Sequence, residues 1–140
     1  MGKLSYLLDS NILSEPLKPM PNPGVMDGLL SHNEQCATAA VVWHELRYGY
    51  ERLPDGRKKQ IIGNYLERLA SAALPILPYE QNAAAWHANE RARLANLGLT
   101  PSFADGQIAA IAQANNLILV SRNTADYSGF KGLKVENWFS

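Results

Sequence analysis

The chain has 140 residues, of which 46% are apolar and 19% charged, and its 13 Lys and Arg balance its 13 Asp and Glu. This length and composition predict a single globular domain spanning residues 1–140, and the balanced charge argues against a general polycation for DNA or acidic membranes. With one cysteine, no apolar run of about 20 residues and no export signal, we expect neither a disulfide nor a membrane span, and we expect a cytoplasmic protein.

Short apolar segments alternate with helical patterns along the whole chain. Asp9 ends the first segment, Pro16 closes a short helical turn, the Pro-rich stretch 16–24 is expected to be a surface loop, and Gly98 ends a later helix. The predicted elements, in chain order, are a strand at 4–8, a helix from Pro23 capped by Asn22, a strand at 36–40, helices at 41–53 and 57–73, a strand at 74–77, helices at 81–97 and 105–115, and strands at 117–120 and 134–137. This alternation is typical of an α/β fold with a mostly parallel sheet.

Carboxylates follow the carboxyl ends of the predicted strands, which is where ligands bind in open α/β sheets. Asp9 follows the first strand, the second strand leads into the helix that carries Glu45, and Asp126 lies shortly after the fourth strand. Asp105 stands at the start of the helix that precedes this fourth strand. Four acids from separate segments are therefore expected to approach one edge of the sheet.

Two of these acids also have a purely structural explanation. Asp9 could simply cap a helix, and Asp105 fits a capping box with Ser102. The helical period, however, places Asp105 on the face that its helix buries. An inward carboxylate is costly unless it is paired, hydrogen-bonded or bound to metal, so the pattern favours a functional role.

Glu45 lies beside the apolar stripe of its helix. It could be a surface residue paired with Arg47 or Arg52, which would stabilise the helix by a few tenths of a kcal/mol. One turn later, Gly49 costs about 1 kcal/mol relative to Ala in mid-helix. Close approach of another element or of a substrate backbone would explain this glycine.

Four carboxylates without neutralising Lys or Arg would repel one another, and a hard divalent cation would resolve that conflict. Ligation by oxygen alone suits Mg²⁺ or Mn²⁺ rather than Zn²⁺. Zinc is further disfavoured because the three histidines and the single cysteine lack metal-binding spacing.

Four segments, taken together, resemble the PIN-domain ribonucleases, and among these the VapC toxins of the FitB-like kind. They are Leu8-Asp9-Ser10-Asn11-Ile12, Trp43-His44-Glu45-Leu46-Arg47-Tyr48-Gly49, Ala104-Asp105-Gly106-Gln107-Ile108-Ala109-Ala110 and Val120-Ser121-Arg122-Asn123-Thr124-Ala125-Asp126-Tyr127. The resemblance implies a three-layer α/β/α domain with a mostly parallel five-stranded sheet. It also implies the toxin of a type II toxin–antitoxin system, an endoribonuclease that depends on Mg²⁺, with Mn²⁺ as a substitute.

The resemblance extends to individual residues. It implies that the metal is anchored by Asp9, Glu45 and Asp105, that Asp126 completes the site, and that Asn11, Ser121 and Asn123 give polar support. Because some relatives have an acid where Asn123 stands, whether Asp126 or Asn123 completes the metal site stays open. A metal-activated water would cleave the phosphodiester bond, with transfer RNA as a candidate target and Arg122 as the expected phosphate contact. The implied partners are a VapB/FitA-like antitoxin, a second copy of the chain and, with the antitoxin, operator DNA.

Two other classes of protein collect acids at strand ends or keep this fold. A phosphoryl-transfer or receiver-like domain would need a Lys after a late strand, where this chain has Ser121-Arg122. A catalytically inert PIN-fold module that acts with a DNA-binding antitoxin would keep the fold without needing metal. Metal binding therefore separates the nuclease from the inert module.

Overall fold

The computed structural model describes residues 3–72 and 74–140 and contains one five-stranded sheet. Its strands are β1 (Tyr6–Leu8), β2 (Cys36–Ala39), β3 (Ile76–Leu77), β4 (Ile118–Val120) and β5 (Val135–Glu136). They are ordered β3-β2-β1-β4-β5, and every pair is parallel. The predicted mostly parallel sheet is therefore confirmed, in an all-parallel form.

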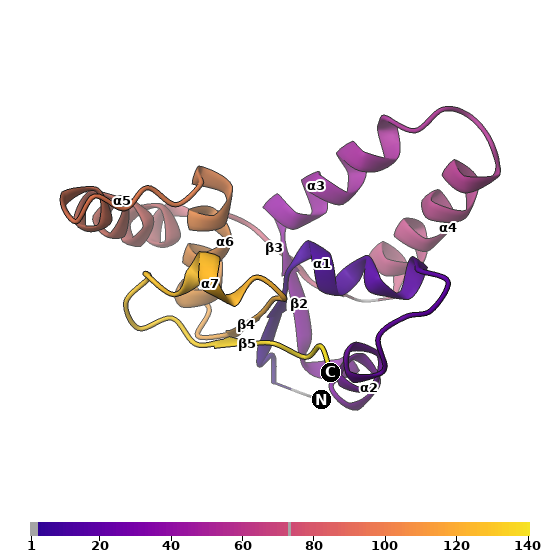
Figure 1. The fold of residues 1–140 in the computed structure, drawn as a ribbon, viewed down its shortest axis with the longest axis horizontal. Helices are drawn as coiled ribbons and strands as arrows, with labels where there is room; N and C mark the ends of the chain where they lie inside the picture. The colour runs from indigo at the N-terminus through magenta and orange to yellow at the C-terminus, as the bar shows by residue number, and fades with distance from the viewer. Residues whose placement is uncertain (1–2, 73) are drawn as a thin grey trace.

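Helices flank this sheet. They are α1 (Ser10–Leu13), α2 (Pro23–Ser31), α3 (Ala40–Glu51), α4 (Arg57–Ser71), α5 (Gln81–Asn96), α6 (Phe103–Ala114) and α7 (Thr124–Tyr127), with 3-10 turns η1 (Glu15–Leu17) and η2 (Asn33–Gln35). Figure 1 shows α1 to α4 gathered on one side of the strands and α5 to α7 on the other. The predicted α/β/α architecture is thus confirmed. No helix within the described residues is long and apolar enough to cross a membrane.

The core explains why the central strands are short apolar runs in the sequence. Leu7, Leu119 and Val120 are completely buried, and Leu8 is 1% exposed, because helices cover both faces of a parallel sheet. In the register of the sheet, Leu8 lies between Thr38 of β2 and Val120 of β4. The residues that follow β1, β2 and β4 therefore leave the sheet at one common edge.

Several element boundaries differ from the predicted ones. α6 begins at Phe103 rather than at residue 105, because Ser102 is the N-cap and its hydroxyl accepts the Asp105 N–H at 3.1 Å. Pro16 does not close the first helical turn but lies within η1, where a proline at the start of a helix is tolerated. The turn α7 was not predicted. Ala73, the predicted last residue of the helix that starts at residue 57, lies outside the described residues.

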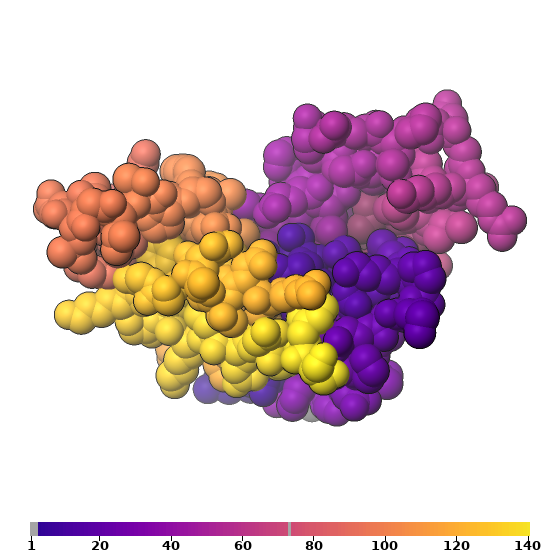
Figure 2. Space-filling model, in the orientation of Figure 1, coloured from indigo at the N-terminus to yellow at the C-terminus, as the bar shows by residue number. Residues whose placement is uncertain are grey.

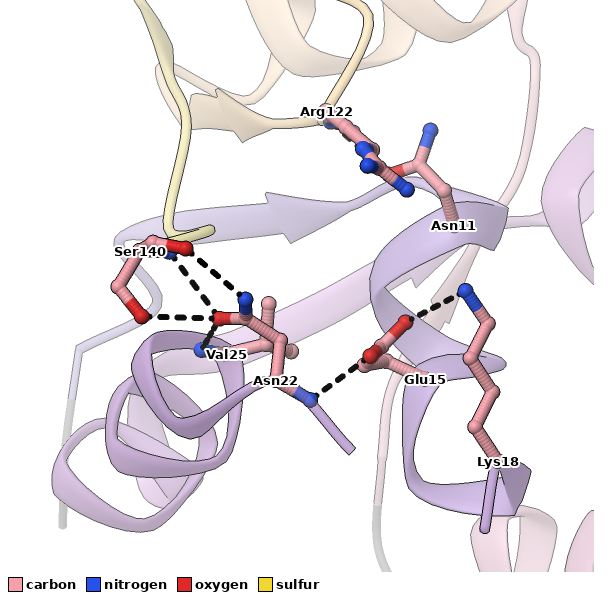
Figure 3. Close-up of polar contacts among 7 residues, drawn as sticks. All are labelled: Asn11, Glu15, Lys18, Asn22, Val25, Arg122 and Ser140. Atoms are coloured by element: carbon pink, nitrogen blue, oxygen red, sulfur yellow. Dashed lines mark hydrogen bonds and ion pairs between the residues drawn. The ribbon is translucent and has the colours of Figure 1, made fainter. Parts of the chain in front are cut away.

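The C-terminal segment packs back onto α2. The Trp138 ring lies so close to Gly28 that a Cβ there would come within 2.4 Å of its Cε3. Asn22, the predicted cap of α2, accepts the N–H groups of Gly24 and Val25 and also that of Ser140 (Figure 3). The cap prediction is confirmed, and the same side chain ties the end of the chain to the start of α2.

Candidate active site

Asp9 lies directly after the central strand and is 5% exposed. Its Oδ1 accepts the Ser10 N–H at 2.8 Å, and its Oδ2 accepts the hydroxyls of Ser121 at 2.8 Å and Tyr127 at 3.1 Å. Asp9 therefore caps α1 and is also held by two hydroxyls. No Lys or Arg of the described chain forms an ion pair with it, so its charge is left without a cationic partner.

A small hydrogen-bond network supports Asp9. Ser121, which follows β4 and is fully buried, donates to Asp9 and accepts the Asn123 N–H at 3.0 Å and the Asn11 amide at 3.4 Å. Asn11 in turn accepts the Arg122 N–H at 3.0 Å. The structure thus links Asn11 and Ser121 to Asp9, whereas Asn123 contributes its backbone and keeps an exposed side chain.

Asp105 approaches the same point from the first turn of α6. Its side chain is half-buried, and its Oδ1 lies 3.3 Å from the Tyr127 hydroxyl that also contacts Asp9. Burial raises the pKa of Asp105 and the charges of Asp9 and Asp126 raise it further, while hydrogen bonds from Ser102 and Tyr127 oppose this shift. Carboxylates from two elements therefore meet at one hydroxyl.

Glu45 faces this pair from α3. Partial desolvation raises its pKa, and the charges of Asp9 and Asp105 raise it further. Glu45 forms neither of the ion pairs considered above, with Arg47 or with Arg52. Arg47 pairs with Glu51 at 3.0 Å instead, and no ion pair within the described chain involves Glu45. Glu45 is thus an exposed acid whose pKa is raised by two neighbouring carboxylates rather than lowered by an arginine.

Asp126 is the fourth of the predicted acids. It is exposed on α7 and lines, together with Asp105, a cavity of about 400 Å³. Its charge acts on Asp105, but no hydrogen bond joins its side chain to Asp9, Tyr127 or Ser121 among the residues that are described. The structure therefore joins Asp9 and Asp105 through one hydroxyl, and Glu45 and Asp126 are exposed acids whose charges act on this pair.

Arg122 stands beside the network with an exposed side chain. Its guanidinium lies 4.7 Å from the centre of the Phe139 ring, and Figure 3 shows Arg122 next to Asn11. Glu15 is a buried acid that was not predicted to belong to the site. Lys18 hydrogen-bonds to it and lowers its pKa, helped by the Asn22 N–H at 2.8 Å, so Glu15 organises the Pro-rich segment.

The shape of the molecule opens toward these acids. Figure 1 shows α1, α3, α6 and α7 meeting near the ends of β1 and β4, and Figure 2 shows the surface hollowed between the α3–α4 and α5–α6 regions. No three Asp, Glu, His or Cys side chains converge into a ready-made metal site in the parts of the chain that the structure describes. Mg²⁺, however, commonly takes one or two carboxylates and fills its other positions with water. Asp9 and Asp105, with Glu45 reached through water, fit that donor set.

The close approach expected at Gly49 does not come from the part of the chain that the structure describes. A Cβ at Gly49 would have no atom within 4 Å. We therefore expect Gly49→Ala to stabilise the fold by about 0.5–1 kcal/mol. Alanine lowers the conformational entropy of the unfolded chain, and its Cβ would not clash in the folded helix. Thermal unfolding measures this change. Gly106→Ala is the matched contrast: its Cβ would lie 2.1 Å from the His87 Nε2, so it should lower the melting temperature.

Comparisons with known proteins find similar sequences over most of the chain. The PIN domain model matches residues 6–129. The chain is 36% identical over 129 residues to "Toxin FitB" of Neisseria gonorrhoeae, covering 86% of this chain and 89% of that protein. It is 31% identical to "VapC ribonuclease Y4jK" of Sinorhizobium fredii, with 94% and 95% covered, and 29% identical to "tRNA(fMet)-specific endonuclease VapC" of Shigella flexneri, with 96% and 98% covered.

Solved structures share the fold over almost their whole length. "Structure of FitAB bound to IR36 DNA fragment" superposes with a TM-score of 0.83 at 32% identity, covering 96% of both chains. "Toxin-antitoxin complex from Klebsiella pneumoniae" superposes with a TM-score of 0.69 at 25% identity, covering 97% of this chain and 99% of that one. The similarity therefore includes all five strands and the helices that carry the acids.

Proposed function

The chain belongs to the PIN-domain family, beside the VapC and FitB toxins, and from this premise we propose that it is the ribonuclease toxin of a type II toxin–antitoxin system. One observation carries the proposal within the chain itself. Asp9, buried and without a cationic partner among the described residues, shares the Tyr127 hydroxyl with Asp105 at the carboxyl edge of the sheet. Uncompensated carboxylates at that place are costly for folding and useful for binding a cation.

Mg²⁺, with Mn²⁺ as a substitute, is the proposed cofactor. Asp9 and Asp105 would hold it directly, Glu45 would hold it through water, and Asp126 would add charge at the rim. When bound, such a cation lowers the pKa of its water and offsets charge on the phosphate. With the cation bound, a water molecule would attack the phosphorus and the bond to the 3′ oxygen would break, which would leave a 5′-phosphate and a 3′-hydroxyl and would not need the 2′-hydroxyl as the nucleophile. Asn11 and Ser121 keep Asp9 in place during that reaction.

Arg122 is the proposed contact to the RNA phosphate. The Phe139 ring supports its guanidinium from one side, and its backbone is tied through Asn11 to the network around Asp9. A planar guanidinium in such a position can bind a phosphate through two parallel hydrogen bonds. The cation and Arg122 would then attract the same phosphodiester group from two sides.

The proposed partners are an antitoxin of the VapB/FitA kind, RNA and a second copy of this chain, with operator DNA bound through the antitoxin. Two similar structures support the antitoxin and the DNA: one is of FitAB bound to a DNA fragment and the other is of a toxin–antitoxin complex.

The test uses the purified chain without antitoxin, incubated with total transfer RNA and Mg²⁺ or Mn²⁺. We expect discrete fragments that disappear with EDTA, and sequencing of their ends would give the cleavage site. Transfer RNA is the first substrate because the relative from Shigella flexneri is named for it. If the folded protein cuts neither transfer RNA nor total RNA and binds no Mn²⁺ in calorimetry, the inert binding module is the correct interpretation.

A further inference from the structure

Tyr127 carries a hydroxyl group into the centre of the acidic site. Its ring is 2% exposed and packs near Phe130, with ring centres 6.5 Å apart. Its oxygen lies 3.1 Å from Asp9 Oδ2 and 3.3 Å from Asp105 Oδ1. The core therefore sets the position of the ring, and the ring in turn sets the position of the hydroxyl between two carboxylates.

The Tyr127 hydroxyl is not needed for packing of the ring. Packing of the ring needs only a phenylalanine, whereas a buried hydroxyl must be hydrogen-bonded to offset its lost hydration. Its only partners within the described chain are the oxygens of Asp9 and Asp105. Asp9 follows β1 and caps α1, whereas Asp105 lies in the first turn of α6, so the Tyr127 hydroxyl links two separate parts of the fold.

From this geometry we propose that Tyr127 is a positioning residue that fixes the spacing and orientation of Asp9 and Asp105 for the divalent cation. The inference rests on the proposed function. Tyr127 engages one oxygen of each carboxylate, Oδ2 of Asp9 and Oδ1 of Asp105, and leaves the other oxygen of each out of this contact. Groups that hydrogen-bond to ligands in this way orient them, and losing one costs about 10- to 100-fold in metal affinity or activity.

The test removes only the hydroxyl. Tyr127→Phe keeps the buried ring, so we expect Mn²⁺ affinity, measured by electron paramagnetic resonance or calorimetry, to fall about 10- to 100-fold. RNA cleavage should fall at low Mn²⁺ and recover in part at high Mn²⁺, because ligand orientation affects binding of the cation first. Tyr65→Phe is the matched control: it removes a tyrosine hydroxyl that donates to the Leu13 carbonyl, away from the acids, and should leave Mn²⁺ affinity unchanged.

The possible outcomes separate this inference from the proposed function. If Tyr127→Phe binds Mn²⁺ as tightly as the wild type, or more tightly, while Asp9→Asn loses binding, Tyr127 does not position the ligands and the metal site still stands. If Asp9→Asn also binds Mn²⁺ normally, the proposed site itself is wrong.

A measurement on the wild type covers the case in which Tyr127→Phe does not fold. In an NMR titration with Mg²⁺, the ring signals of Tyr127 should shift in step with binding, and those of Tyr65 should stay in place. An unshifted Tyr127 signal in a protein that binds Mg²⁺ would overturn the inference.

Discussion

Asp9→Asn is expected to reduce RNA cleavage by more than about 100-fold. Loss of a residue that only hydrogen-bonds to a metal ligand costs about 10- to 100-fold, and Asp9 is proposed to be a ligand itself. Asp9 is the most deeply buried of the four acids and receives hydrogen bonds from Ser10, Ser121 and Tyr127. An amide keeps the shape of the side chain but removes the negative charge that would bind the cation. Initial rates of fragment formation from transfer RNA measure the loss.

The fold should survive this change, because the two hydroxyls can rotate to accept hydrogen bonds from the new amide group. Circular dichroism and the melting temperature verify this. Asp27→Asn is the matched control, since Asp27 is an exposed acid on α2, remote from the network around Asp9. Cleavage by Asp9→Asn at a rate within a few fold of the control would show that Asp9 does not hold the cation.

The acids could be predicted from the sequence because each follows a local rule. Parallel strands end at one edge, which placed Asp9 and Ser121, and the helical period placed Asp105 on the buried side of α6. The outcome for Asp105 combines two predicted alternatives: Ser102 does cap the helix, and the carboxylate still turns inward. Local patterns sufficed here because short segments fix the direction of these side chains.

Tyr127 and Glu15 could not be found in the same way. Tyr127 contacts Asp9 across 118 positions in the chain, and this contact depends on β4 lying beside β1 in the sheet. In the sequence, a tyrosine after a turn looks like any residue at the edge of the core. The burial of Glu15 was not predicted, because the Pro-rich stretch beside it suggested a surface loop, whereas Lys18 and Asn22 both contact its buried carboxylate.

The exposed position of Asp126 affects how the fourth place of the site is understood. The resemblance left Asp126 and Asn123 as alternatives, and both side chains are exposed on α7 or at its cap. Only Asp126 bears a charge that acts on Asp105. Its assignment to the fourth place remains a prediction, supported by this electrostatic contact and by the cavity it shares with Asp105.

The second large effect is expected in stability: a divalent cation should stabilise the protein at neutral pH and not at acidic pH. Folding raises the pKa values of Glu45 and Asp105, so the folded chain binds more protons than the unfolded chain between the ordinary and the raised values. Stability of the metal-free protein therefore falls as the pH rises through that window. At pH values above this window, both carboxylates are ionised in the folded protein, which lowers its stability. A bound cation then offsets their repulsion.

Differential scanning calorimetry with and without Mn²⁺ measures this effect. At pH 7.5 and a Mn²⁺ concentration 100 times the dissociation constant, binding contributes about 2.7 kcal/mol, which corresponds to a rise of about 5–10 °C in melting temperature. The gain should shrink as the pH falls through the raised pKa values, because protons then occupy the carboxylates.

Asp105→Asn separates this electrostatic effect from general stabilisation by salt. Without metal, the variant should melt a few degrees above the wild type at pH 7.5, because it removes a carboxylate whose ionised form the fold disfavours. It should also gain almost nothing from Mn²⁺. An equal gain in the variant and the wild type would mean that the cation binds elsewhere on the chain. The fold therefore keeps at Asp105 a charge that costs stability, as expected where an acid is retained for binding a cation.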